Sequence, residues 1–284
     1  MKNMQVEDVI NDLQEQRNAL HKNFELTKIL NNKNSIHDFR LSIKKIRAIY
    51  NFIKELNLIK NKKLKIDNDL RELYRSSGNY RDLQVQLKLA ETYENTTHKD
   101  FAAYKAFLGK KAKNRKKDFV KFLKKFNLKH SLKSLDRSMK YLQKNLNSEA
   151  LKEKNNRYLQ NKSDVIEKTL IQKRNENRLH DLRKHVKELY YYFDFIADQF
   201  TLKKYEDIDV EKLKDMSEHL GDWHDRFVML TYLDEFIRKK HKKILLSQSD
   251  YKFLTELVES DGERLINKVE DDLFIEITTI KKIS

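Results

Sequence analysis

The sequence contains the same pair of motifs twice, at a constant separation of 143 residues. Residues 36–46 (IHDFRLSIKKI) correspond to residues 179–189 (LHDLRKHVKEL), and residues 78–82 (GNYRD) correspond to residues 221–225 (GDWHD). In each copy the histidine precedes the glycine by 41 residues. Two motifs that keep their spacing twice are typical of an internal structural repeat, so we expect two similar halves.

The composition favours an all-α protein. The chain of 284 residues has no proline and only four glycines, the two residues that helix interiors tolerate least. Hydrophobic residues make up 39% of the chain, which is enough to form a packed core. Apolar residues recur at spacings of three and four through almost the whole sequence, as in amphipathic helices. We therefore expect two four-helix bundles packed side by side.

The expected helices follow from this periodicity. In the first half they cover about residues 5–30, 35–58, 61–93 and 98–126, with Asn34 or Ser35 capping the second helix. A shorter helix is expected between about 127 and 147. In the second half the helices cover about residues 149–174, 177–200, 208–240 and 249–272. The β-branched segment 274–280 is not assigned to any element.

Several classes of protein are disfavoured. The chain has no cysteine, which excludes disulfides, thiolate metal sites and cysteine nucleophiles. No run of 18 apolar residues is present, and the first residues lack the apolar stretch of a secretory signal. We therefore expect a soluble cytoplasmic protein.

The net charge of +16 points to a polyanionic partner. The alternative is a nucleotide bias in the genome, which would scatter solvated lysines over the surface. Clustering of the cations distinguishes the two, and the cations do cluster.

The helix expected after residue 35 has two contrasting faces. At about 100° per residue, a histidine and three basic residues fall within an arc of about 80°, opposite a face that contains Phe39, Ile43 and Ile46. We call these cations the first strip: His37, Arg40, Lys44 and Arg47. The same face of the second copy carries the second strip: His180, Arg183, Lys184 and Lys187. A charged helix face is usually only solvated. These strips, however, occur twice and are expected to have no acidic partners four residues away.

The following helix carries a companion face. Its members in the first copy are Arg71, Arg75, Gly78 and Asp82, and in the second copy Lys214, Glu218, Gly221 and Asp225. A glycine inside a helix costs about 1 kcal/mol relative to alanine, which suggests that a neighbouring helix or a ligand comes close there. The aspartates are expected to orient a cationic neighbour. The alternative is an ordinary pair within the helix, between Asp82 and Arg75 or Arg81.

These residues resemble the CHAD family, the conserved histidine α-helical domain. The resemblance rests on His-x-x-Arg-x-x-x-Lys-Lys-x-Arg at 37–47 and Gly-x-x-Arg-Asp-x-x-Val at 78–85, and on their second copies at 180–187 and 221–228. It implies one domain over 1–284, built from a first four-helix repeat (1–127), a connector (128–147), a second repeat (148–273) and a tail (274–284). It also implies a basic central channel between the halves that binds inorganic polyphosphate. Targeting to polyphosphate granules, regulation and scaffolding are all consistent with such binding.

The resemblance also assigns residues. Polyphosphate would be bound by both strips together with three cations of the companion face: His37, Arg40, Lys44, Arg47, His180, Arg183, Lys184, Lys187, Arg71, Arg75 and Lys214. Supporting roles would fall to Gly78, Arg81, Asp82, Gly221 and Asp225. The second copy departs from the first, because Tyr190 replaces Arg47, His224 replaces Arg81 and Glu188 replaces Lys45. We therefore expect the second half to contribute less positive charge.

Other functions remain open. The first alternative is a general polyanion or nucleic-acid binder. The lysine-rich segment 110–125 could form its binding surface, but an ordinary solvated helix would also explain that segment. A phosphate-handling enzyme is the second, with His37 or His180 as phosphoryl acceptor. A histidine among arginines and lysines is a poor metal ligand, so no metal is expected. No phosphate-binding loop, dinucleotide motif or hydrolase motif is present, and we expect neither a cofactor nor catalysis.

Overall fold

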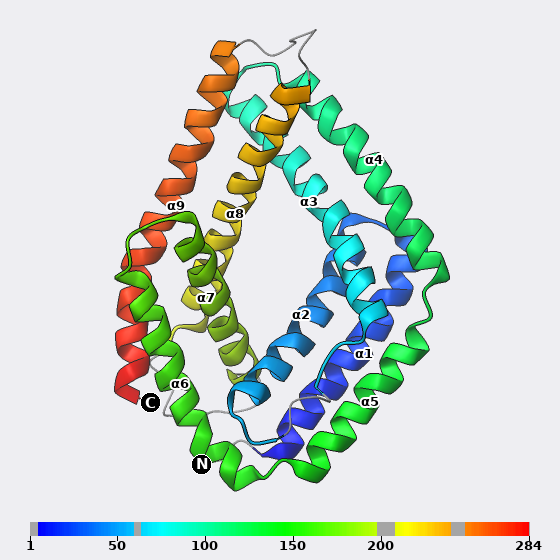
Figure 1. The fold of residues 1–284 in the computed structure, drawn as a ribbon, viewed down its shortest axis with the longest axis vertical. Helices are drawn as coiled ribbons and strands as arrows, with labels where there is room; N and C mark the ends of the chain where they lie inside the picture. The colour runs from blue at the N-terminus through cyan, green and yellow to red at the C-terminus, as the bar shows by residue number, and fades with distance from the viewer. Residues whose placement is uncertain (1–4, 60–63, 198–207, 240–247, 284) are drawn as a thin grey trace. The chain divides into compact units, whose positions relative to one another are not determined.

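The structure is a computed structural model that describes residues 5–59, 64–197, 208–239 and 248–283. Every regular element in these ranges is an α-helix, as the composition predicts (Figure 1). The helices are α1 (Val6–Leu30), α2 (Lys33–Glu55), α3 (Asn68–Thr97), α4 (Ala102–Lys125), α5 (Leu128–Asn145), α6 (Ser148–Leu170), α7 (Glu176–Ala197), α8 (Val210–Lys239) and α9 (Gln248–Ile283).

The predicted helix starts need two corrections. The N-cap of α2 is Asn32, whose side chain accepts a hydrogen bond of 2.9 Å from the amide of Ser35, so the predicted caps at 34 and 35 are wrong. Helix α3 starts at Asn68 rather than at 61, because Asp67 accepts from the amide of Leu70 at 3.0 Å and thereby caps the helix. Residues 61–63, 198–200 and 240 of the predicted helices lie outside the described residues.

The segment 274–280 is helical. Helix α9 continues through it to Ile283, so the predicted end at 272 is wrong. Leu273, Ile277 and Ile280 are buried at helical spacing. Packing of this apolar face outweighs the modest helix penalty of the β-branched residues.

The cores of α2 and α7 lie where the repeat predicts. Phe39, Ile43 and Ile46 are buried in α2, and Leu182 and Val186 are buried in α7. Helix α2 packs against α1 and α7, α1 also packs against α5, and α6 packs against α7 (Figure 1). The cationic strips therefore lie on helices whose opposite faces are fixed by a core.

The chain divides into two compact units. Unit 1 contains residues 1–72, 126–218 and 270–284, and unit 2 contains residues 73–125 and 219–269. Each unit thus takes residues from both halves of the sequence. The predicted boundaries at 127, 147 and 273, and the packing of the repeats around a central channel, stay predictions.

Candidate functional site

Both cationic strips lie in unit 1. The first strip is on α2 and the second on α7, two helices that contact each other although their motifs are 143 residues apart. His37 and Arg47 are exposed, and Arg40 and Lys44 are half-buried. The fold therefore brings the two copies of the first motif into one compact unit.

The second strip is less purely cationic than predicted. The Nε2 atom of His180 lies 3.7 Å from a carboxylate oxygen of Glu176, four residues earlier in α7. Lys184 lies near Glu188, four residues later, and its charge helps to lower the pKa of that carboxyl. The expectation of no acidic partner at this spacing is wrong for α7. These carboxylates add to the substitutions that reduce the positive charge of the second strip; a smaller contribution of the second half to binding stays a prediction.

Arg183 has an unusual environment. Its Nε atom is buried and has no hydrogen-bond partner among the described residues. A buried donor without a partner costs about 1–3 kcal/mol, and more when the group is charged. Arg183 is therefore a cation that an anion close to α7 would stabilise.

Cations also crowd the end of α2. Burial lowers the pKa of Lys54, and the charges of Arg47 and Arg71 lower it further. The three side chains therefore lie close enough to repel one another, which a bound polyanion would relieve. Lys54 is not among the predicted site residues, although it stands seven residues after Arg47 and so on the same helix face.

Two further predicted cations of unit 1, Arg71 and Lys214, also have protein partners. A terminal guanidinium nitrogen of Arg71 donates to the carbonyl of Ile66 at 3.3 Å, and Lys214 donates to Glu211 at 2.9 Å. The remaining predicted residues belong to unit 2: Arg75, Gly78, Arg81, Asp82, Gly221 and Asp225. Their place in the binding site stays a prediction.

The close approach expected at the mid-helix glycines is not seen at Gly221. Apart from its chain neighbours and the adjacent backbone of its own helix, no atom of the described residues lies within 4 Å of the point where a Cβ would stand. Packing of another helix therefore does not explain this glycine. At Gly262 the corresponding point lies 3.5 Å from the side chain of Trp223, which is buried as a packing residue.

An ion pair joins α2 to α7. Lys45 pairs with Asp194 at 2.8 Å. Asp12 of α1 is within electrostatic reach of both, and burial raises its pKa to about 6 even though Gln16 donates a hydrogen bond to it. Asp12 thus binds a proton more readily in the folded protein than in the unfolded chain.

Asp12→Asn is expected to stabilise the protein at neutral pH. Because the folded-state pKa of Asp12 lies above the unfolded value of 3.8, its ionisation lowers stability as the pH rises from about 4 to 6. Asparagine removes this penalty, so the free energy of unfolding at pH 7.5 should rise by about 1 kcal/mol, allowing for the partial solvation of the group. Urea unfolding at pH 7.5 and pH 4 tests this, with Asp271→Asn as an exposed control. An equal gain at both pH values would contradict it.

A second ionic cluster joins α2, α6 and α7. The ammonium of Lys162 donates to Glu55 at 3.1 Å and to Glu188 at 2.9 Å. Burial raises the pKa of Glu188, but the imidazole of His185, whose Nδ1 lies 3.7 Å from the carboxylate, and the charge of Lys162 outweigh this and bring the pKa to about 2. Glu188, which replaces a lysine of the first copy, therefore serves as the anchor for a buried cation.

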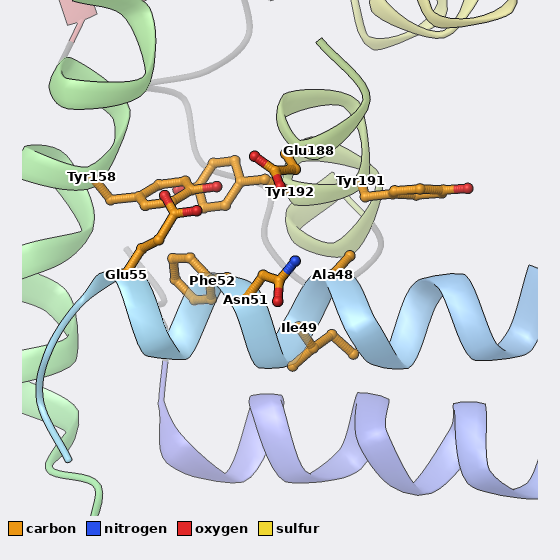
Figure 2. A pocket seen from close by; sticks show the side chains of 9 residues that line it. All are labelled: Ala48, Ile49, Asn51, Phe52, Glu55, Tyr158, Glu188, Tyr191 and Tyr192. Carbon is orange, nitrogen blue, oxygen red and sulfur yellow. The ribbon is translucent and has the colours of Figure 1, made fainter. Parts of the chain in front are cut away.

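A small pocket lies beside this cluster. Figure 2 shows Phe52, Tyr158 and Tyr192 gathered between the three helices, with Glu55 and Glu188 beside them and Tyr191 directed away. The ring centres of Phe52 and Tyr158 are 5.0 Å apart. Two carboxylates make this pocket unsuitable for a polyanion, and the tyrosines act in packing.

The described residues offer neither a metal site nor a membrane span. They contain no group of three or more histidine, aspartate or glutamate side chains that could hold a metal ion. In the same ranges, no helix is sufficiently long and apolar to cross a membrane. A cytoplasmic location at polyphosphate granules stays a prediction.

Comparisons with known proteins agree with the motifs. The crystal structure of the CHAD domain from the plant Ricinus communis superposes with a TM-score of 0.71, over 96% of this chain and 92% of that chain, at 15% sequence identity. This similarity shows the fold. No curated protein matches the sequence. The family profile of the CHAD domain matches residues 11–234. The chain therefore belongs to the CHAD domain family, as its doubled histidine and glycine motifs predict.

Proposed function

We propose that this CHAD domain binds inorganic polyphosphate through the cationic strips of α2 and α7 and does not transform it. The observation that carries the proposal is the contact between these two helices, one from each half of the sequence, within one compact unit. Their apolar faces are buried, so the strips are held on the remaining surface of each helix.

The chemistry of the strips suits a polymer of phosphates. Polyphosphate carries about one negative charge per phosphate and offers oxygens in all directions. An arginine can donate to two of these oxygens at once, whereas a lysine acts as a mobile point charge. The crowding around Lys54 and the buried Nε of Arg183 both favour an anion beside the helices.

The absence of catalysis is also part of the proposal. A phosphotransfer histidine needs an acidic group that orients it and a partner for the leaving group. Glu176, beside His180, is exposed on the first turn of α7 and is a weak candidate for that role. Incubation with long-chain polyphosphate should therefore leave the chain-length distribution unchanged.

A titration at about 150 mM salt tests the proposal. It compares long-chain polyphosphate with a single-stranded DNA of equal charge, for the native protein and for a strip variant in which Arg40, Lys44, Arg183 and Lys187 are replaced by alanine. We expect the native protein to prefer polyphosphate and the strip variant to bind it at least tenfold more weakly, since four charge contacts are lost.

A matched control removes the same charge elsewhere. It replaces four exposed, dispersed lysines by alanine: Lys22, Lys88, Lys152 and Lys168. This dispersed control should bind polyphosphate within about twofold of the native protein, because its lysines are spread over α1, α3 and α6 and belong to neither strip. Equal polyphosphate affinity of the native protein and the strip variant would overturn the proposal.

A further inference from the structure

Most of the excess positive charge lies outside the strips. Residues 110–144 contain 14 lysines or arginines and two aspartates, a net charge of +12. The rest of the chain contains 46 lysines or arginines and 42 acidic residues, a net charge of +4. Polyphosphate binding at the strips leaves this concentration of charge unexplained.

On α4 the charge forms a straight row. Five lysines fall within an arc of about 80° of the helix. These lysines, the α4 row, are Lys110, Lys113, Lys117, Lys121 and Lys124, and all five are exposed. The row points away from the buried face, which contains Leu108, Phe119 and Leu123. No ion pair or side-chain hydrogen bond of these lysines is recorded with any described residue.

The repeat provides an internal comparison. Helix α9 stands 143 residues after α4 and also contributes to unit 2. The five positions that correspond to the α4 row are Phe253, Glu256, Ser260, Arg264 and Asn267. They contain one cation and one anion, so a general lysine bias does not explain the row. The charge is specific to one of two corresponding helices of the same unit.

Helix α4 offers phosphate contacts and no means of reading bases. Its apolar face is occupied within unit 2, where Tyr80 stacks on Phe119 and Lys111 pairs with Glu235, so it cannot insert into a lipid surface. The exposed row has no aromatic side chain for base stacking, which single-stranded nucleic acids require. With lipid insertion and base stacking disfavoured, the contact that the row can make is with a phosphate backbone, independent of base sequence.

A stiff polyanion fits an open row better than a flexible one. A flexible chain loses conformational entropy at every unit that it lays along an exposed surface. Duplex DNA is already straight over such a distance, since its persistence length is about 50 nm. From Lys110 to Lys124 the row rises by 14 residue steps, roughly 21 Å at 1.5 Å per residue, which faces about six phosphates of one strand.

We propose that the α4 row is a second binding site, which contacts the phosphate backbone of double-stranded nucleic acid without reading its sequence. This site is separate in its residues from the strips and does not depend on their ligand. Helix α5 carries a comparable row of exposed cations in unit 1: Lys129, Lys133, Arg137, Lys140 and Lys144. That row is left intact in the experiment below and is the same in every variant compared.

The test uses a 30-base-pair DNA duplex of arbitrary sequence. A row variant replaces the five lysines of α4 by alanine, and a five-site dispersed control adds Lys282→Ala to the four substitutions above. The row variant should bind the duplex at least tenfold more weakly at 100 mM salt. The plot of the logarithm of the association constant against the logarithm of salt concentration should become less steep, its negative slope shrinking in magnitude by up to about 4. The five-site control should change neither quantity appreciably. Alanine favours helices, so the row variant is expected to fold, and circular dichroism checks this.

Two further arms separate this site from the strips. The strip variant should keep its affinity for the duplex, and the row variant should keep its affinity for polyphosphate. Native duplex affinity in the row variant overturns the proposal. The proposal is also overturned if the row variant binds the duplex normally but no longer binds polyphosphate, or no longer binds anionic vesicles (phosphatidylserine in phosphatidylcholine). Either result would assign the row to that ligand. If the strip variant fails to lose polyphosphate while the row variant loses the duplex, the proposed function fails and this inference stands.

Discussion

Lys162→Ala is expected to lower the free energy of unfolding by about 3–5 kcal/mol. The side chain of Lys162 is only 5% exposed, and its ammonium bridges Glu55 on α2 and Glu188 on α7. The substitution leaves Glu188, itself largely buried, without its main cationic partner. Removal of one member of a buried ion pair costs more than the pair contributes, because the other charge remains desolvated.

Equilibrium unfolding in urea at pH 7.5 measures this effect. Lys168→Ala, at an exposed position on the same helix, is the control and should change stability by less than about 0.5 kcal/mol. Because the folded-state pKa of Glu188 lies below its unfolded value, its stabilising contribution is present above about pH 4.5 and is lost as the pH falls through about 2. The difference in free energy of unfolding between the native protein and Lys162→Ala should therefore become smaller as the pH falls toward 2. A loss below 1 kcal/mol at pH 7.5 would show that the bridge is unimportant.

Arg178→Ala is expected to cost a similar amount, about 3–5 kcal/mol. The side chain of Arg178 is 4% exposed. Its guanidinium donates to the carbonyls of Thr169 and Leu170 at 2.7 and 2.6 Å, and to Glu270 at 2.6 Å. It thus satisfies the last carbonyls of α6 and anchors α9 to unit 1. Alanine leaves several buried acceptors without a donor.

Arg174→Ala is the matched control for Arg178→Ala. Arg174 pairs with the second carboxylate oxygen of Glu270, but its side chain is 43% exposed. An exposed ion pair contributes about 0–1 kcal/mol, so this variant should unfold at nearly the native urea concentration. Equal losses for the two variants would mean that the charge of Glu270, and not the buried carbonyls, dominates.

The repeated elements of this fold could be predicted from the sequence. The buried positions of α2 and α7 could be predicted because apolar residues recur every three or four residues along each helix. The motifs also identify the helices that carry the strips. Lys54 lies on the same face and could have been found by extending the periodicity by two turns.

The parts that could not be predicted depend on contacts between distant residues. In the sequence, Glu188 is only a position where the second copy lacks a lysine of the first. Its role as a partner of Lys162 could not be predicted, because Lys162 is 26 residues away on another helix. The helical state of 274–280 depends on burial of Ile277 and Ile280, which local propensity does not indicate. The start of α2 differs for a local reason, because several polar residues near 32–35 compete to be the cap.

The interleaving of the two units constrains how this protein can be made. Unit 1 needs residues 270–284 in addition to its earlier segments, and unit 2 needs residues 219–269. A ribosome that has synthesised the whole first repeat has therefore completed neither unit, and Arg178 must wait for Glu270 to emerge about 90 residues later. Nascent chains of this protein expose unfinished apolar faces for most of their synthesis, and that places them among the polypeptides for which chaperone access during translation matters most.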